Sequence, residues 1–165
     1  MELCYEGGAV MLEQAHIAKN YEEGKAMLEK VIKDGSAFDL FVKMVKAQGG
    51  DVEYILHPEK FELAKKIIPI LAKEDGYIKE LDALEIGIAA MKLGAGRETL
   101  EDKIDMSAGI ILNHKVGSKV NKGDVLCVAY TNKNNVDDAL AQIRGAYKIV
   151  DEVVYAQPVI REIVD

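Results

Sequence analysis

Two glycine-centred turns between short apolar runs constrain the fold of this chain more than any other feature. Gly117 lies inside the segment 115–120, and Gly123 stands just before the apolar run that begins at Val125. Glycine adopts the positive φ angles that tight turns need, and other residues resist them. We therefore expect short β-strands joined by tight turns. The side chains expected to be buried against one another are Val116, Val120, Val125 and Leu126.

A second group of glycines follows a predicted helix in the middle of the chain. Asp82 is placed to cap a helix over 83–93, with Glu85 completing the capping pair, and Gly94 ends that helix. The residues after it are polar and include Gly96. This part of the chain therefore predicts a capped helix followed by a loop.

Further strands are predicted from β-branched runs. They lie at 67–72, from Gly76, at 109–113 and at 125–130, and Pro69 places the first of them at a sheet edge. The residues expected to shape turns are Gly76, Gly117, Gly123 and Asp124.

The end of the chain reads as a helix followed by a strand. The polar run 132–135 is a loop whose last residue, Asn135, would cap the helix. Pro158 would place a final strand over 153–163 at a sheet edge. The predicted apolar stripe of the helix consists of Val136, Leu140, Ile143, Tyr147 and Val150.

The first fifty residues read as three helices. The first covers about 2–19, Asn20 caps the second, Ser36 caps the third, and Gly49 stops it. These helices carry more apolar residues than three short helices need, so they look cut from a larger body. After them we expect a turn at His57 and a short helix over 59–66.

Composition excludes several classes of function. The formal net charge of −7 argues against a nucleic-acid partner, which would need clustered Lys and Arg. No apolar run reaches the roughly 20 residues of a membrane span, so no membrane partner is expected. The N-terminus lacks the basic residues of a signal peptide. Cys4 and Cys127 stand far apart, which suits a reducing compartment and makes the cytoplasm the expected location.

The predicted fold class is α+β. A helical segment of three helices at 1–50 and a connector with an edge strand at 51–74 precede a small α/β domain at 75–165. The strands of that domain are expected to be barrel-sandwich-like, as in lipoyl and biotinyl domains, with two helices. Exposed apolar faces of the first helices could also join copies of the chain into a homo-oligomer.

The ordered motifs of the chain resemble the C-terminal portion of pyrimidine-nucleoside phosphorylases, a family that includes the thymidine phosphorylases. The resemblance begins at Glu2-Leu3-Cys4, passes through 47–51 and continues to 157–160, and it is densest over 76–126. The chain departs from the family pattern at three positions, where lysine, valine and aspartate are usual. These positions are Leu100, Ala108 and Ser118.

The resemblance implies a parent glycosyltransferase that converts a pyrimidine nucleoside and phosphate into a free base and a pentose 1-phosphate. In that family a Lys-His-Ser loop, a glycine-rich phosphate segment and later Arg, Ser and Lys residues do the chemistry, and all lie upstream of the part matched here. The potassium-binding positions lie upstream too. We therefore expect no catalytic residue, metal or cofactor in this chain, with phosphate only as the parent's co-substrate. By itself the chain should be inactive.

The loop after Gly94 is the best functional candidate. The resemblance implies that this loop faces the catalytic cleft, helps the domains to close, and pairs the chain with the N-terminal catalytic part of the same enzyme. Arg97 could then reach the other lobe with its guanidinium group. The residues predicted for closure or interface are Gly94, Gly96, Arg97, Asp102 and Asp105.

Other readings stay open. A stand-alone interaction module is one alternative. A carrier domain modified on Lys92 is another, because 90–93 mimics a biotin-acceptor tetrapeptide, although that lysine precedes the glycine turns and falls on a helix. His16 is expected to be a packed or capping residue, and neither His57 nor His114 has a second ligand at metal spacing.

Overall fold

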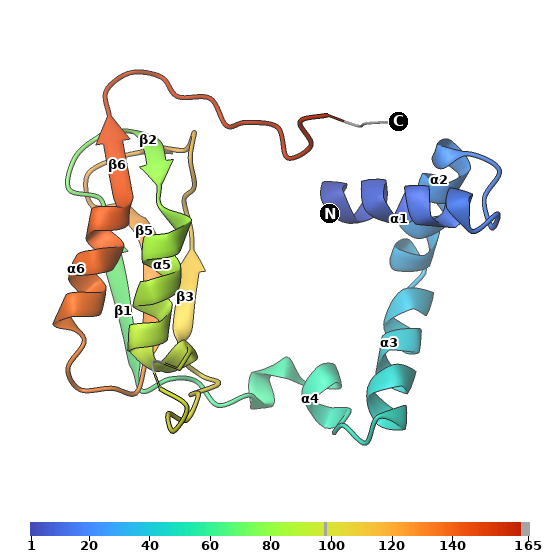
Figure 1. Ribbon diagram of the computed structural model, residues 1–165, viewed down its shortest axis with the longest axis horizontal. Helices are drawn as coiled ribbons and strands as arrows, with labels where there is room; N and C mark the ends of the chain where they lie inside the picture. The colour runs from blue at the N-terminus through green and yellow to red at the C-terminus, as the bar shows by residue number, and fades with distance from the viewer. Residues whose placement is uncertain (98, 163–165) are drawn as a thin grey trace. The chain divides into compact units, whose positions relative to one another are not determined.

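The computed structural model describes residues 1–97 and 99–162, which form two compact units. The helical unit comprises Met1–Lys60 together with the chain end from Pro158, and the sheet unit comprises Phe61–Gln157 (Figure 1). The described part is a mixture of helices and two small antiparallel sheets, so the α+β class is confirmed. The three-part division at residues 50 and 74 stays a prediction.

The helical unit contains α1 (Glu2–Gln14), α2 (Tyr21–Lys33), α3 (Ser36–Ala47), α4 (Glu53–Leu56) and a 3₁₀ turn, η1 (Pro58–Lys60). The backbones of α1 and α2 approach closely, since a Cβ on Gly24 would lie 2.9 Å from the Ala9 carbonyl oxygen. Lys25 and Glu6 form an ion pair of 3.3 Å between the same two helices. The side chain of Asn20 caps α2 by accepting from the Glu23 amide, as predicted.

Four predictions for this unit were wrong in detail. The first helix ends at Gln14, not near residue 19, and His16 adopts a positive φ of 57° with an exposed side chain, so it is not packed. The third helix begins at Ser36 after Gly35, and the carboxylate of Asp34 accepts from the Ser36 amide in place of the predicted Ser36 cap. The helix expected over 59–66 is reduced to η1.

The sheet unit is built on two three-stranded antiparallel sheets. The first has the order β1 (Lys66–Leu71), β5 (Val125–Thr131), β3 (Gly109–Leu112), and the second the order β4 (Lys119–Val120), β2 (Gly76–Leu81), β6 (Tyr147–Val150). As predicted, Pro69 lies in an edge strand, where its missing amide hydrogen breaks no ladder. The relation to lipoyl and biotinyl domains stays a prediction.

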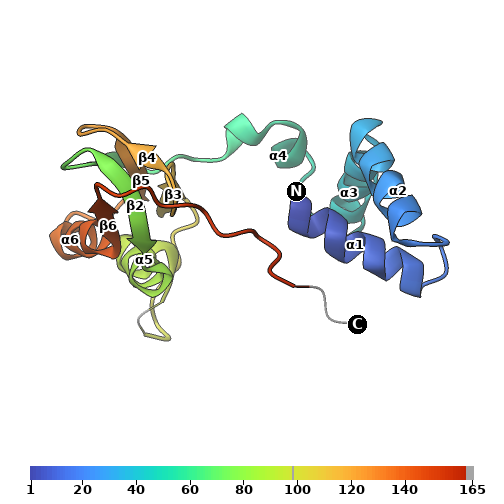
Figure 2. The same cartoon turned by 90° about the horizontal axis from the view of Figure 1, so that it is seen from above.

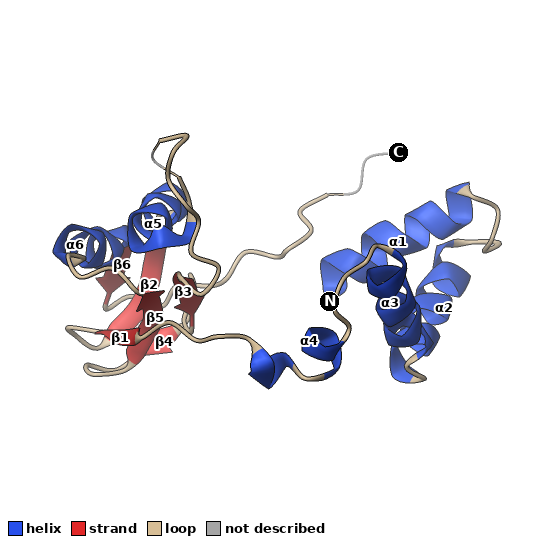
Figure 3. Cartoon of the chain, turned by 90° about the horizontal axis from the view of Figure 1, so that it is seen from below, coloured by secondary structure: helices blue, strands red, loops and turns tan. Residues whose placement is uncertain are grey.

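Two helices lie on the same side of these strands, α5 (Ala83–Ala90) and α6 (Asp137–Ala146) (Figure 3). Asp82 caps α5 by accepting from the amides of Leu84 and Glu85, as predicted. A π turn, η2 (Met91–Ala95), continues α5.

Apolar side chains from both helices and the first sheet form the main core. Its buried members are Ile70, Ala89, Leu93, Cys127, Ala129, Val136, Ala139, Leu140 and Ile143. A smaller cluster under the second sheet consists of Ala72, Ile78, Val120 and Leu126, with Val116 packed against it. Val125 is half-buried and lies outside that cluster, so the predicted burial holds for three of the four residues named around the glycine turns.

The last third of the chain contains three corrections. The stripe predicted as one helix breaks at Ala146, and Tyr147–Val150 forms β6 instead, because its β-branched residues pair with β2. The N-cap of α6 is Val136, and the Asn135 side chain makes no cap there. Over 153–162 the chain has no regular strand, and residue 163 lies outside the described residues.

Glycines shape the turns around the second sheet. Gly117 and Gly123 have φ angles of 88° and 96°, as predicted, and Gly76 has 149°. A Cβ on Gly76 would lie 2.5 Å from the Val150 carbonyl oxygen, so the close pairing of β2 and β6 requires glycine there. Asp124 contributes by accepting from the Asn121 amide at 2.8 Å. Among the described residues, no helix combines the length and apolarity needed to cross a membrane.

Candidate functional site: an anchored loop at the end of helix α5

The predicted closure residues lie in or beside one loop, which begins where α5 changes into η2. Gly94 has a φ of 115°, which only glycine adopts without strain, and this residue turns the chain out of the helix. The hydroxyl of Thr131, fully buried in β5, donates to the Leu93 carbonyl at 2.7 Å. Carbonyls at the end of a helix have no partner within the helix, and this bond supplies one for Leu93.

We name residues 95–97 and 99–107 the closure loop, after the role predicted for them; Figure 2 shows it reaching past the end of α5. The loop is closed at its base, where the Asp105 amide donates to the Gly94 carbonyl at 2.9 Å. Farther along, the Thr99 amide donates to a carboxylate oxygen of Asp102 at 2.8 Å. Asp102 therefore shapes the loop from within.

Asp105 is the centre of a polar network at the base of the loop. One of its carboxylate oxygens accepts from the Ser107 amide at 3.0 Å and from the Ser107 hydroxyl at 2.7 Å. The other accepts from the Asn132 side-chain amide at 2.8 Å, and the same amide donates to the Ser107 hydroxyl oxygen at 3.0 Å. The Asn132 side-chain oxygen accepts from the Lys65 amide at 2.8 Å. Three separate segments of the chain meet at this network.

The hydrogen bonds to Asp105 stabilise its charged form. The Ser107 side chain, the Ser107 amide and the Asn132 side chain together hold the pKa of the Asp105 carboxyl below its ordinary value, in that order of influence. The carboxylate is therefore ionised, and an acceptor in each of these bonds, at neutral pH.

The loop also presents apolar and cationic side chains to solvent. Leu100 is 93% exposed and Met106 is 91% exposed, and Ile104 is also exposed. The Arg97 side chain is exposed as well. Large apolar side chains at such exposure contribute nothing to the core of the unit, so they mark a surface suited to contact.

A hollow of about 710 Å³ lies beside the base of the loop. Its walls come from the loop end at Asp105–Ala108, from β3 and from the segment before β1, including Phe61 and Leu63. Tyr130 and Asn132 complete it. The hollow holds no cluster of His, Cys, Asp and Glu suited to a metal ion, and none was found elsewhere among the described residues.

The structure brings some predicted residues together and leaves others apart. Gly94 and Asp105 meet at the loop base, and Gly96 and Arg97 follow in the same loop. Asn132 was not predicted as a site residue. The signal that could have found it is the run of asparagines directly after a buried strand, because a polar side chain there tends to bond to a neighbouring loop. The predicted turn residues Gly117, Gly123 and Asp124 lie in the turns on either side of β4 and not in this loop.

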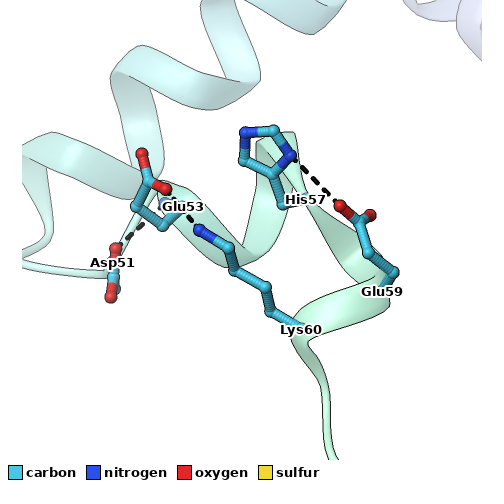
Figure 4. Close-up of polar contacts among 5 residues, drawn as sticks. All are labelled: Asp51, Glu53, His57, Glu59 and Lys60. Carbon is cyan, nitrogen blue, oxygen red and sulfur yellow. Dashed lines mark hydrogen bonds and ion pairs between the residues drawn. The ribbon is translucent and has the colours of Figure 1, made fainter.

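The segment 51–60, before the sheet unit, carries local polar contacts (Figure 4). His57 Nδ1 lies 3.2 Å from Glu59 Oε1, and Lys60 Nζ lies 2.6 Å from Glu53 Oε2. The Glu53 amide donates to Asp51 at 2.9 Å, which begins the short α4. Every one of these side chains is exposed, so the group stabilises a turn and makes no enclosed site.

Lys92 lies in the π turn after α5 and is half-buried. The acceptor lysine of a carrier domain projects from a β-hairpin, whereas this lysine follows a helix. Its neighbourhood is a smaller hollow of about 300 Å³ that it shares with Lys133 and Asp138.

Comparison with known proteins matches the chain, including most of the sheet unit, to one family. Residues 77–150 match the family model described as the pyrimidine nucleoside phosphorylase C-terminal domain. A pyrimidine-nucleoside phosphorylase of Geobacillus stearothermophilus is 47% identical over 137 residues, which is 83% of this chain and 32% of that protein. One from Staphylococcus aureus is 41% identical over 153 residues, 93% of this chain and 35% of that protein. The chain thus spans about a third of the length of these relatives.

Proposed function

Since the chain belongs to the pyrimidine-nucleoside phosphorylase family and matches its C-terminal portion, we propose that it is the C-terminal part of such an enzyme, a glycosyltransferase that exchanges the base of a pyrimidine nucleoside for phosphate. Its role is to close over an active site carried by an N-terminal catalytic part. The observation that carries this proposal is the 47% identity to the Geobacillus stearothermophilus relative, which extends over most of this chain.

The chemistry of the described residues fits a part that assists catalysis and does not carry it out. Phosphorolysis needs donors that bind phosphate and donors that stabilise the departing base. The described part of the closure loop offers two cations, Arg97 and Lys103, both exposed, and not an enclosed group of donors. A guanidinium at such a position is suited to pair with an anionic group across a domain boundary.

The position of Lys92 in a helical turn speaks for this proposal over the carrier alternative. The cytoplasm remains the expected location, since Cys4 and Cys127 are both free thiols, one exposed and one buried.

Activity assays with a chimera test the proposal. The matching C-terminal segment of the Geobacillus stearothermophilus enzyme would be replaced by this chain, and release of free base from a pyrimidine nucleoside would be measured with phosphate present and absent. We expect phosphate-dependent release from the chimera and none from this chain alone. Release by this chain alone, or a folded chimera without release, would reject the proposal.

Arg97→Ala in the chimera tests the closure role. Loss of a charge-assisted contact across the closed cleft should lower kcat/KM about tenfold or more. Lys103→Ala, in the same loop, is the matched control and should leave kcat/KM within about twofold. Equal kinetics for Arg97→Ala and the unchanged chimera would remove the closure role and leave the family assignment standing.

A further inference from the structure

We propose that Asn132, Asp105 and Ser107 form an anchor that holds the closure loop in one position, preorganised so that Leu100, Met106 and Arg97 dock on an apolar surface that carries an anionic group in the catalytic part of the enzyme. The docking step rests on the proposed function. The anchor itself does not, because it is defined by contacts within this chain.

The anchor joins three segments that are distant in sequence. Asn132 follows β5, Asp105 and Ser107 end the loop, and Lys65 precedes β1. Asn132 uses its amide group to donate to the loop and its oxygen to accept from Lys65. Its donors and acceptor are therefore all used in tying the loop end to the edge of the first sheet.

The beginning of the loop is tied to the same strand. Thr131 precedes Asn132, and its hydroxyl holds the Leu93 carbonyl at 2.7 Å just before the loop starts. The Lys133 amide donates to the Thr131 hydroxyl oxygen at 3.1 Å, so this hydroxyl is itself held in place. Both ends of the loop are thus fixed by consecutive residues of one strand end.

The fixed base contrasts with exposed apolar side chains in the same loop. Leu100 and Met106 contact no core cluster, and their exposure costs free energy in water. A loop that is held at its base and apolar at its surface avoids much of the entropy cost of ordering when it binds. Arg97 adds a cation that would be strongly favourable only opposite an anion. An apolar surface with one carboxylate or phosphate group is therefore the fitting partner.

The relatives supply a candidate for that partner. They extend over about three times the length matched here, and the matched model is the C-terminal domain. A second copy of this chain is the competing occupant. It would reveal itself as a concentration-dependent dimer that Leu100→Ser abolishes, and that result would overturn the assignment of the partner.

The anchor can be tested on this chain alone by tryptic cleavage after Lys103, followed by mass spectrometry. Asn132→Ala removes two hydrogen bonds to the loop, so cleavage should accelerate about tenfold. Asn132→Asp keeps the acceptor for Lys65 but loses both donors, and it should accelerate cleavage at least as much. Asn134→Ala is the matched control, because its side chain bonds to Lys66 and not to the loop. Unchanged cleavage in both Asn132 variants would overturn the anchor.

Ser107→Ala covers the case in which the Asn132 variants unfold. It removes one hydroxyl from the network and should accelerate cleavage about threefold, with the thermal unfolding midpoint nearly unchanged. Cleavage equal to that of the unchanged chain would count against the anchor in this variant too.

Positioning is separated from mere stability by kinetics in the chimera. If Asn132 acts through Arg97, the double variant Asn132→Ala with Arg97→Ala should be no slower than Arg97→Ala alone. If the double variant instead lost kcat/KM by the product of the two single-variant factors, Asn132 would not act through Arg97. A chimera without any activity would reject the proposed function, whereas the tryptic experiment would still decide the anchor.

Discussion

The two units of this protein hold their apolar residues in opposite ways. In the sheet unit, large side chains such as Ile70, Leu93 and Ile143 are fully buried between α5, α6 and the first sheet. In the helical unit, the buried apolar residues are small, Ala9 and Ala18 among them. Many of the larger ones are exposed, including Leu40, Phe41 and Met44 of α3.

This difference teaches which region can be stable alone. Burial of large side chains is the main favourable term in folding, so the sheet unit has its own source of stability. The helical unit gains less from burial and more from local features such as the Asn20 cap and the Lys25–Glu6 ion pair. Its exposed faces are those of helices suited to further burial, in a larger enzyme or in a homo-oligomer.

The largest expected effect comes from the same truncation made in each unit. Leu93→Ala removes a fully buried side chain and should lower the free energy of unfolding by about 3 kcal/mol. Leu40→Ala removes a side chain that is 67% exposed and should change it by about 0.5 kcal/mol or less. Urea unfolding followed by circular dichroism measures both. Losses of equal size would contradict the contrast between the units.

Glycine turns of the sheet unit give the next effect. Gly117→Ala combines a positive φ with a Cβ that would lie 2.5 Å from the Ala156 amide nitrogen, so about 2–3 kcal/mol should be lost. Gly123→Ala has a similar φ but no atom within 4 Å, and about 1 kcal/mol should be lost. Thermal unfolding of the two variants separates the effect of steric contact of the new Cβ from the effect of backbone strain at positive φ. A Gly123 variant as unstable as the Gly117 variant would show that contact with Ala156 does not matter.

Loss of a helix cap should destabilise a different extent of structure in each of the two units. Asp82→Ala and Asn20→Ala each remove a side chain that accepts backbone amides, worth about 1 kcal/mol. Because α5 lies on the main core, the Asp82 change should lower the stability of the whole sheet unit. The Asn20 change should increase hydrogen exchange mainly in the first turn of α2. Exchange that rises throughout the helical unit would show that its helices unfold together.

The smallest effects concern pH. Hydrogen bonds from the Ser36 side chain and then its amide lower the pKa of Asp34 in the helical unit, much as Ser107 and Asn132 lower that of Asp105. A carboxyl with a lowered pKa adds stability above its unfolded pKa of about 4, and this is lost as pH falls through the folded value. NMR titration should find both values below the ordinary one. Asn132→Ala should raise only that of Asp105, and no change would exclude its bond to Asn132.

Local signals predicted much of the fold. The caps at Asn20 and Asp82, the edge position of Pro69 and the turns at Gly117 and Gly123 depend on nearby residues, and each was confirmed. The break between α6 and β6 could not be predicted in this way. Tyr147–Val150 continues the helical spacing of apolar residues, but pairing with β2 across the sheet decides its conformation.

The candidate site shows the same division. In the sequence, Gly94 and Arg97 indicated the closure loop as a candidate site. Its anchor depends on Asn132, which is 27 residues from Asp105 along the chain, and no local pattern joins the two. Ser36 and Asn135 each carried the sequence signal for a helix cap, but a neighbouring residue takes the N-cap position in both cases. Val153 carried the signal for a strand, but no strand pairs with that segment among the described residues.

Tyr147 packs against both apolar clusters of the sheet unit, and its hydroxyl donates to the Leu126 carbonyl at 3.3 Å. One aromatic ring therefore packs against two clusters, of which the smaller joins the second sheet to Leu126 of β5 in the first. Unfolding of either sheet would remove packing contacts from the other. The unit should therefore unfold cooperatively, in a single calorimetric transition. Heating should thus produce one endotherm for residues 61–157, even though the sheet within it is divided in two.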